Sequence, residues 1–261
     1  MSDYLARFRG VAALYGLDAL NRLKNASLTI AGVGGVGSWA AEAAARTGIG
    51  HIRIIDHDDI SITNVNRQCH ALASTIGKPK AEVFAARLKD INPDLDIRYH
   101  RGFMDADNIP ELFPAEQADT HYVIEAIDSI DSKAALINHL KRNHYTFVVS
   151  GGGGGKTDAS RTISSDLSAV KQDPLLASLR QKLRENYGFT ARGSHKFGIR
   201  CVYIDAPRVK PASVCSPDEI ERLAEHFDSG IVTFGTCMAV TATLGLAVAR
   251  EMIARIVADV R

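Results

Sequence analysis

Short apolar runs alternate with amphipathic stretches over the first 150 residues of the chain. Runs rich in β-branched residues predict strands at 27–31, 51–56, 95–100, 121–128 and 146–150. Helical periodicity, as in Val83, Phe84, Leu88 and Ile91, predicts helices over 38–46, 78–91 and 132–143. This alternation predicts an α/β fold, a Rossmann-like, doubly wound and mostly parallel sheet with helices on both faces. Ligands of such sheets bind beyond the carboxyl ends of the strands.

A glycine-rich turn follows the first predicted strand and precedes the first helix. Its spacing is G-x-G-x-x-G, with glycines at Gly32, Gly34 and Gly37 and a further one at Gly35. Such a turn brings backbone amides against a phosphate at the positive end of a helix. Asp56 ends the second strand, nineteen residues beyond Gly37, where an acid binds ribose hydroxyls. Glycine turns also occur for packing alone, but this context favours nucleotide binding.

The segment after Asp56 is polar and irregular, and long polar segments inside an α/β domain tend to be functional. The polar residues that we expect at the nucleotide are Asp58, Asn64, Asn66, Arg67, Gln68 and Lys80. A triphosphate needs cationic donors for its charges and carboxylates for the accompanying Mg²⁺, whereas a nicotinamide cofactor needs fewer such groups. The segment therefore favours ATP over the alternative of an NAD-dependent dehydrogenase.

A second glycine run, 151–155, precedes Lys156 and Thr157 and resembles a Walker A loop. Ser150 stands where the first glycine of that motif is required. A P-loop must also open an α-helix, and residues 158–165 have no helical apolar period. The sequence therefore argues against a P-loop here.

The chain length of 261 residues suits one large α/β domain. We expect the nucleotide-binding part at about 1–155, a basic C-terminal insert at about 171–200 and a helical part at about 218–261. Lys and Arg total 31 against 30 acids, so only local clustering can indicate a charged partner. The insert holds seven basic residues and two acids. Those that we expect to bind nucleic acid are Arg180, Lys182, Arg184, Arg192, Lys196 and Arg200. A solvated helix followed by a loop is the alternative.

Four scattered cysteines form no C-x-x-C pair, and the N-terminus does not read as a signal peptide. We therefore expect free thiols and a cytoplasmic protein. Residues 231–249 carry no charge, but threonines and glycines interrupt them and Arg250 follows. This stretch predicts a buried helix rather than a membrane span.

Several motifs together resemble the ThiF/MoeB-like superfamily of ubiquitin-activating-type adenylating enzymes, and its tRNA threonylcarbamoyladenosine dehydratase branch most closely. They are GVGGVGSWAAEAAARTGIG, IDHDDI, TNVNRQCHAL, GKPKAEV, INPDLDI and AIDSIDSKAALI. The resemblance covers residues 14–155 strongly and the later part more loosely. Several motifs in order are far more specific than one glycine loop.

The resemblance implies that ATP with Mg²⁺ is the cofactor and that the enzyme activates a carboxylate as an acyl-adenylate. Gly32 to Gly37 would surround the phosphates and Asp56 would bind the ribose. The phosphates would be contacted by Asn66, Arg67, Gln68 and Lys80. Asp128 would orient Mg²⁺ or the α-phosphate, so Arg67, Lys80 and Asp128 are the expected catalytic residues. A strand-end cap for the two aspartates and a surface ion pair for Arg67 are the alternatives.

The same branch implies a tRNA substrate whose threonylcarbamoyladenosine loses water as a ring closes. It also implies a homodimer and suggests a cysteine desulfurase as a sulfur-transfer partner. Gly230 stands where a candidate cysteine of the branch falls, and Cys237 is the nearest possible thiol. We expect Cys237 to be a small core residue, because apolar side chains flank it, and ring closure to proceed directly from the adenylate.

Two other functions stay open at this point. One is an adenylyltransferase that activates the C-terminal Gly-Gly of a ubiquitin-like sulfur carrier. The other is a nucleotide- or tRNA-binding module without catalysis. Several sulfur-carrier enzymes have zinc-binding C-x-x-C pairs, which this chain lacks. A module of the second kind would need only the glycine loop and the ribose acid, not Arg67, Lys80 and Asp128 together.

Overall fold

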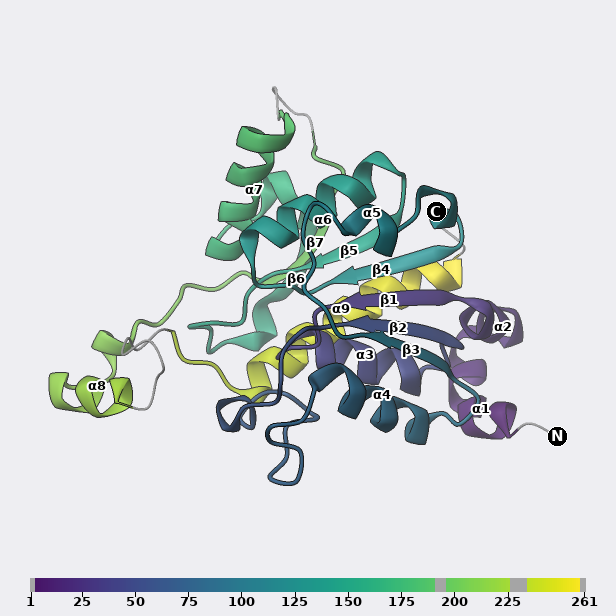
Figure 1. Cartoon of the computed structure of the whole chain (residues 1–261), viewed down its shortest axis with the longest axis horizontal. Coiled ribbons are helices and arrows are strands. Elements are labelled where there is room, and N and C mark those ends of the chain that lie inside the picture. The colour runs from purple at the N-terminus through teal and green to yellow at the C-terminus, as the bar shows by residue number, and fades with distance from the viewer. Residues whose placement is uncertain (1–2, 191–195, 226–233, 259–261) are drawn as a thin grey trace.

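One twisted sheet runs through the molecule, and the computed structural model describes residues 3–190, 196–225 and 234–258 of the chain. Within these residues seven strands pair in the order β3-β2-β1-β4-β5-β7-β6 (Figure 1). The strands are β1 (Ser27–Ala31), β2 (His51–Ile55), β3 (Asp96–His100), β4 (His121–Glu125), β5 (Thr146–Ser150), β6 (Thr162–Asp166) and β7 (Arg200–Ile204). Only β6 among them is antiparallel to its neighbour. The predicted Rossmann-like sheet is confirmed.

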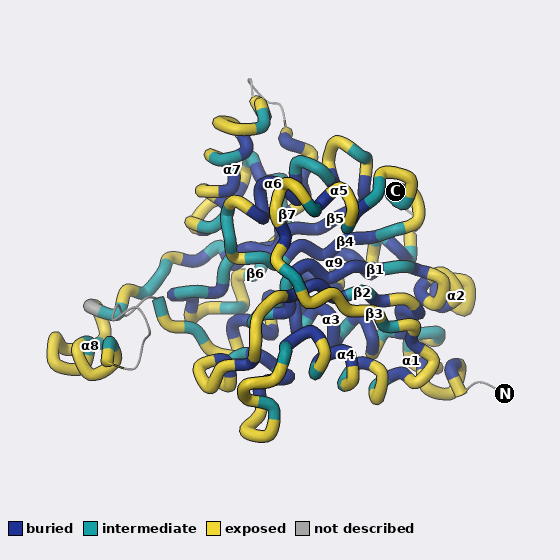
Figure 2. The backbone as a smooth tube through the Cα atoms, viewed as in Figure 1, coloured by how far each residue is buried: buried dark blue, intermediate teal, exposed yellow. Residues whose placement is uncertain are grey.

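Helices cover both faces of the sheet. They are α1 (Tyr4–Tyr15), α2 (Leu17–Asn25), α3 (Gly37–Arg46), α4 (Lys80–Ile91), α5 (Ile109–Leu112), α6 (Ile130–Arg142), α7 (Pro174–Tyr187), α8 (Pro217–Ala224) and α9 (Met238–Ala258). Helices α3, α4 and α9 pack on one face, and α5, α6 and α7 pack on the other (Figure 1). The strand side chains between these layers are buried, as the dark blue interior of Figure 2 shows. Each face therefore has its own apolar core, which is the reason for the near-continuous apolar runs in the strands.

Small side chains bring α3 and α9 close together. Ala40, Ala41 and Ala44 of α3 are buried, and Gly245 of α9 faces this helix. A Cβ on Gly245 would lie 2.8 Å from that of Trp39, which is closer than two carbons can approach. The alanine-rich sequence thus fixes where α9 lies, and with it the start of α9 beside the glycine turn.

The charge-free stretch 231–249 is helical only in part. Residues 231–233 lie outside the described part of the chain, and α9 begins at Met238. The helix continues past Ala249 to Ala258, and within this part Glu251 forms ion pairs with Arg200 and Arg255. Among the described residues, no helix combines the length and apolarity that a bilayer span requires.

The predicted basic insert forms α7 and then leads into β7. Asp173 caps α7 by accepting a hydrogen bond from the backbone N–H of Leu176 at 3.0 Å, and Gly188 ends it in a left-handed conformation. Leu176, Leu179 and Leu183 are fully buried against the rest of the domain. The helix is therefore part of the fold and presents only one face to solvent.

Candidate active site

A cleft of about 330 Å³ opens beyond the carboxyl ends of β1, β2, β4 and β5. Its lining brings together residues that are far apart in the sequence. They include Gly32, Gly34, Gly35, Asp56, Asp58, Asn64, Arg67, Gln68, Lys80, Asp128, Gly151, Gly152, Gly153, Gly154, Thr236 and Thr241. The predicted crevice is thus present, and most of the predicted ATP-binding residues line it.

The glycine turn enters the cleft between β1 and α3. Gly32 has φ +86°, and a Cβ there would lie 2.8 Å from the carbonyl oxygen of Ala126. A Cβ on Gly37 would overlap the carbonyl oxygen of Gly32, so this glycine permits close packing and does not line the cleft. Gly34 and Gly35 do line it, at the amino end of α3. Backbone N–H groups at a helix start are an anion site, as a phosphate requires.

Asp56 lies at the floor of the cleft, nine-tenths buried at the end of β2. Its Oδ2 accepts a hydrogen bond from the N–H of Val33 at 2.8 Å, and its Oδ1 accepts one from the N–H of Asp58 at 3.0 Å. The carboxylate thus ties the glycine turn to the next loop, which is the capping role named above as the alternative. A carboxylate has about four acceptor sites, so it can still bind a ribose hydroxyl.

Lys80 begins α4, and its side chain is buried in the wall of the cleft. Its ammonium lies 2.6 Å from Oδ2 of Asp58, and its N–H donates to the carbonyl oxygen of Asp58 at 3.0 Å. Asp58 is half-exposed and itself lines the cleft. The pair places one cation and one carboxylate where ATP would bring its phosphates.

His70 packs behind Lys80 and is fully buried against the ring of Phe84. Burial lowers its pKa to about 4, and the charges of Lys80 and Arg87 act in the same direction. In the unfolded chain histidine titrates near pH 6.5, so between about pH 6.5 and 4 the unfolded state binds a proton that the folded state does not. Stability must therefore fall as the pH falls through this window.

We expect His70 to account for a loss of about 2 kcal/mol in the free energy of unfolding between about pH 7.5 and pH 5. Urea unfolding curves at both pH values measure this loss. His70→Leu removes the titrating group, so the difference between the two pH values should shrink by about that amount. An unchanged pH dependence in His70→Leu would show that other groups cause it.

Arg67 and Asp128 both line the cleft, and their charges interact. Arg67 is held by its Nη1, which donates to the carbonyl oxygen of Thr63 at 2.7 Å and to Oδ1 of Asn66 at 3.0 Å. Burial lowers the pKa of Arg67, and attraction to Asp128 opposes that lowering. Gln68 is buried beside them, and its Oε1 has no hydrogen-bond partner among the described residues. This end of the cleft thus offers a cation, a carboxylate and an unpaired amide oxygen.

The two predicted asparagines shape the loop that carries Arg67. Asn64 is buried and accepts a hydrogen bond from the N–H of Ser61 at 3.0 Å, which caps the short helix Ile62–Asn64. Asn66 is exposed, does not line the cleft and donates to the carbonyl oxygen of Thr236 at 3.0 Å. Contact of Asn66 with phosphate stays a prediction. The structure shows instead that Asn66 links the loop of Arg67 to the segment that contains Thr236.

A buried ion pair beneath the cleft was not anticipated from the sequence. Glu125 ends β4 and Lys133 lies in α6, both side chains are inaccessible to solvent, and their charged atoms are 2.5 Å apart. Glu125 also accepts from the N–H of Ile127 at 2.8 Å, and Lys133 donates to the carbonyl oxygen of Ile127 at 3.1 Å. The pair therefore clamps the peptide that leads to Asp128. The only available signal was a lysine within the apolar face of the predicted helix.

Lys156 confirms that the second glycine run is not a P-loop. Its ammonium is buried and donates to the carbonyl oxygens of Gln172 and Ala206, both at 2.5 Å. The residues after it form a short 3₁₀ helix, Ala159–Arg161, and then β6. The lysine holds two loops together, and Gly151 to Gly154 form part of the wall of the cleft.

The basic residues predicted for nucleic acid have different environments. Arg180 is half-buried and donates to the carbonyl oxygens of Leu167 and Val170, each at 3.1 Å, so it stabilises the domain. Lys182 forms an ion pair with Asp131 at 2.5 Å. Arg184 lies over the ring of Phe197, 5.6 Å from its centre. Lys196 is exposed, and Arg192 lies outside the described residues.

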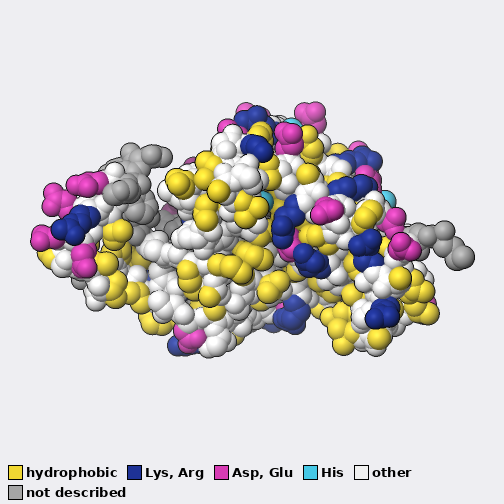
Figure 3. All heavy atoms as spheres, turned by 90° about the horizontal axis from the view of Figure 1, so that it is seen from below, with side chains coloured by type: hydrophobic (Ala, Val, Ile, Leu, Met, Phe, Trp, Pro, Cys, Tyr) yellow, Lys and Arg dark blue, Asp and Glu magenta, His cyan; other side chains and the backbone are white. Residues whose placement is uncertain are grey.

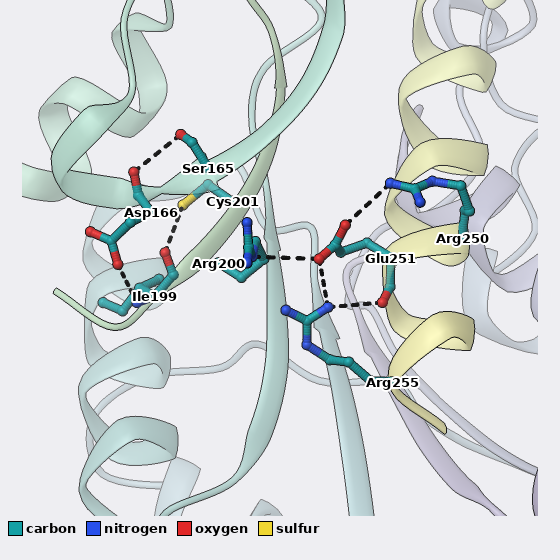
Figure 4. A network of polar contacts seen from close by, with 8 residues as sticks. All are labelled: Ser165, Asp166, Ile199, Arg200, Cys201, Arg250, Glu251 and Arg255. Carbon is teal, nitrogen blue, oxygen red and sulfur yellow. Dashed lines mark hydrogen bonds and ion pairs between the residues drawn. The ribbon is translucent and has the colours of Figure 1, made fainter. Parts of the chain in front are cut away.

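Arg200 belongs to a charged network at the other end of the sheet. Figure 4 shows its guanidinium, with those of Arg250 and Arg255, around the carboxylate of Glu251. Since β7 runs parallel to β5 and starts at Arg200, this network lies at the amino ends of the strands, away from the cleft. Three arginines on one carboxylate leave excess positive charge there.

The prediction that Cys237 is a core residue is wrong. Its side chain is exposed, just before α9 begins at Met238. The apolar neighbours Phe234 and Met238 misled the prediction, because this segment crosses the surface before the helix becomes buried from Val240 onward. Gly230, the other position considered, lies outside the described residues.

One group of three side chains among the described residues could hold a metal ion. The ligand atoms of Asp56, His57 and Asp58 all lie within 4.8 Å of one another. Asp56 already accepts two backbone hydrogen bonds and Asp58 binds Lys80. Mg²⁺ prefers carboxylate, phosphate and water oxygens to a histidine nitrogen, so Asp128 suits it better than this group does.

Comparison with known proteins gives matches over nearly the whole chain. Residues 7–259 match the ThiF family. The chain is 42% identical over 244 residues, 92% of its length and 89% of the relative, to tRNA threonylcarbamoyladenosine dehydratase of Escherichia coli. It superposes on crystal structures of the E. coli enzyme in complex with AMP and with ATP, with TM-scores of 0.86 and 0.85 and identities of 39% and 38%. Both alignments cover 98% of this chain and 95% of the other.

Proposed function

Because the chain belongs to the ThiF family, we propose that it uses ATP to dehydrate N6-threonylcarbamoyladenosine in tRNA through an acyl-adenylate. One observation carries the proposal: the glycine turn, Asp56, Arg67, Lys80 and Asp128 line a single cleft in a chain that matches the E. coli dehydratase over 92% of its length. An enzyme with an ATP complex of the same fold supports ATP as the cofactor here.

The chemistry begins with a carboxylate, which is a poor electrophile. An oxygen of the threonyl carboxylate attacks the α-phosphorus of ATP and pyrophosphate leaves, so the acyl group gains AMP as its leaving group. A nitrogen of the same modification then attacks the acyl carbon, AMP departs, and the net change is loss of water. Lys80 and Arg67 stabilise the charge that develops on the phosphates. Ring closure is intramolecular, so positioning supplies much of its rate.

Mg²⁺ fits the end of the cleft where Asp128 lies. In ATP sites this ion is usually held by one or two carboxylates together with phosphate oxygens and water. Asp128 lines the cleft and is exposed within it, whereas the carboxylate of Asp58 binds Lys80. Bound there, the ion would neutralise phosphate charge opposite Arg67.

The identity of the acceptor is tested by supplying it. We expect the protein with Mg-ATP to release pyrophosphate when tRNA carrying threonylcarbamoyladenosine is added, and not when unmodified tRNA is added. A Gly-Gly-ended sulfur-carrier protein serves as the competing acceptor. Release with the carrier alone would contradict the proposal and indicate sulfur-carrier activation.

We expect Cys237→Ala to dehydrate tRNA within about twofold of the wild-type rate, because ring closure from the adenylate needs no thiol. The exposed position of Cys237 means that the substitution leaves no cavity in the core. Single-turnover dehydration assays at saturating tRNA measure the rate of the chemical steps, and Cys69→Ala, at a half-buried cysteine that does not line the cleft, is the control. A loss of more than a hundredfold in Cys237→Ala alone would indicate a thioester intermediate.

The tRNA backbone is the proposed partner of the exposed basic side chains. Lys196, Arg184 and Arg200 remain candidates, with Lys182 in its exposed ion pair, whereas Arg180 is engaged within the fold. Phosphate contacts of this kind make affinity fall with salt. We also propose a cytoplasmic location, which suits a tRNA substrate.

A homodimer is proposed from the large apolar side chains that remain exposed, and Figure 3 shows apolar surface on one face of the molecule. They include Leu5, Leu14, Leu17, Ile62, Val65, Leu72, Ile76, Met238 and Leu246. Ile62, Val65, Leu72 and Ile76 lie on either side of Arg67 in the sequence, and Met238 begins α9. We also propose that the chain forms one domain and that a cysteine desulfurase is its sulfur-transfer partner.

A further inference from the structure

A second cavity, of about 400 Å³, adjoins the ATP cleft. It lies where the chain leaves the body after Ala206 and returns before α9, and the helix between these points, α8, stands away from the sheet (Figure 1). Thr236 lines both the cleft and the cavity, and the glycine wall of the cleft continues into the cavity at Gly155. The two hollows therefore share one wall.

That wall is fixed by backbone hydrogen bonds on both sides. The N–H of Gly155 donates to the carbonyl oxygen of Gly235 at 2.7 Å, and the carbonyl oxygen of Gly155 accepts from the N–H of Val209 at 2.7 Å. Gly155 has φ +75°, and a Cβ on it would lie 2.8 Å from Cδ1 of Phe234. Gly155 therefore allows the chain to pack against the wall of the cleft both where it leaves the body, at Val209, and where it returns, at Gly235.

Arg208 and Phe234 form a flat cationic platform beside this junction, and neither is among the residues that line the cleft or the cavity. The guanidinium of Arg208 lies 3.2 Å from the centre of the Phe234 ring, and its Nε donates to the carbonyl oxygen of Gly154 at 3.0 Å. Gly154 lines the ATP cleft, so the platform touches the outer side of the cleft wall. The pair therefore holds the wall between the two hollows in place.

The remaining walls suit an uncharged, flat ligand with one polar end. Val209, Pro211, Val214 and Leu223 supply apolar surface, and Lys210 is exposed at the rim. The sulfur-bearing side chains of Cys215 and Cys237 also line this cavity, which gives the exposed thiol a packing role. They add polarizable surface for a base.

The hydroxyl of Thr236 is unpaired within the described part of the chain and lies between the cleft and the second cavity. Oγ1 of Thr236 is buried and has no hydrogen-bond partner among the described residues. A Cβ on Gly153 would lie 3.6 Å from this oxygen and 3.1 Å from Cγ2 of Thr241, while a Cβ on Gly35 would lie 3.3 Å from the same methyl group. The hydroxyl is therefore close to the phosphate-binding turn, and a buried hydroxyl without a partner is costly unless a ligand satisfies it.

We propose that this second cavity is the acceptor subsite, in which the modified adenosine packs against the apolar wall of Val209, Pro211 and Val214. Its threonyl carboxylate then reaches past Thr236 to the α-phosphate in the cleft. This inference rests on the proposed function and adds where the substrate enters. Asp218, Glu219 and Glu221 make the outer helix α8 acidic, as the magenta side chains at the left of Figure 3 show. The RNA backbone therefore leaves the cavity on the Lys210 side.

Val214→Trp tests the subsite by filling it. Val214 is 70% exposed, so the larger ring should not disturb folding. We expect the KM for an anticodon stem-loop RNA carrying the modification to rise at least about tenfold, with an unchanged Kd for ATP, because stacking on each base contributes roughly a tenfold or larger factor. The matched control is Ile163→Trp on β6, 43% exposed and outside both hollows, which should keep the wild-type KM.

Arg208→Lys is the second variant, since it keeps the charge and removes the guanidinium plane. We expect it also to raise the KM for the RNA while ATP binds normally. Wild-type KM values in both variants, beside an active wild-type enzyme, would overturn the subsite and leave the proposed function intact. Failure of the wild-type enzyme to dehydrate the RNA would instead contradict the proposed function.

Discussion

Lys80→Ala is expected to slow dehydration of threonylcarbamoyladenosine in tRNA by roughly 100- to 1000-fold, the usual cost of removing one group that stabilises transition-state charge. The ammonium of Lys80 is held at the cleft wall by Asp58 at 2.6 Å. Its removal leaves the phosphates without a cation there and releases the carboxylate of Asp58 toward them. Single-turnover assays with saturating Mg-ATP measure the rate of the chemical steps.

The matched control is Lys78→Ala, because Lys78 is exposed and lies two residues earlier. It should keep the wild-type rate and shows that a change in net charge is not the cause. The Asp58 carboxylate is half-exposed, so Lys80→Ala should still fold. A folded Lys80→Ala variant with a rate within threefold of wild type would remove Lys80 from the catalytic set.

Lys133→Met is expected to destabilise the protein by about 3–5 kcal/mol, because it leaves the buried carboxylate of Glu125 without its counter-charge. Both side chains are inaccessible to solvent and their charges are 2.5 Å apart. Loss of the clamp on Ile127 should also weaken ATP binding, since Asp128 follows directly. Urea unfolding monitored by circular dichroism measures the stability change.

The double variant Glu125→Gln with Lys133→Met distinguishes the buried charge from a simple packing defect. A neutral glutamine can still accept the hydrogen bond from Ile127, so we expect the double variant to regain at least half of the lost stability. If the two substitutions instead add their separate costs, the uncompensated charge is not the source of the instability.

The sequence was sufficient for the fold and for much of the site, for a physical reason. Strands with residues buried on both faces are mostly apolar and rich in β-branched residues, and Ser27–Ala31 and Thr146–Ser150 have this composition. The glycine turn imposes its own geometry, since Gly32 and Gly37 approach backbone that no side chain could approach. Residues that follow such strands share the carboxyl edge of the sheet, so Asp56 and Asp128 had to line the same cleft.

What the sequence could not predict depends on contacts between distant segments. The pairing of Glu125 with Lys133 depends on the position of α6 over β4. The platform of Arg208 and Phe234 forms because the chain that leaves the body after Ala206 returns to it just before α9. Local composition was misleading at Cys237, where apolar neighbours do not reveal that the segment lies at the surface. The sequence of the basic insert does not distinguish its exposed side chains from Arg180, which is engaged in internal hydrogen bonds.

Mass spectrometry of nucleosides, from tRNA carrying threonylcarbamoyladenosine incubated with this protein and Mg-ATP, tests the central claim most directly. The account predicts that the modified nucleoside loses the mass of one water, that AMP and pyrophosphate appear in equal amounts with it, and that omission of ATP prevents all three changes. An unchanged nucleoside mass in the presence of folded protein and Mg-ATP would contradict it.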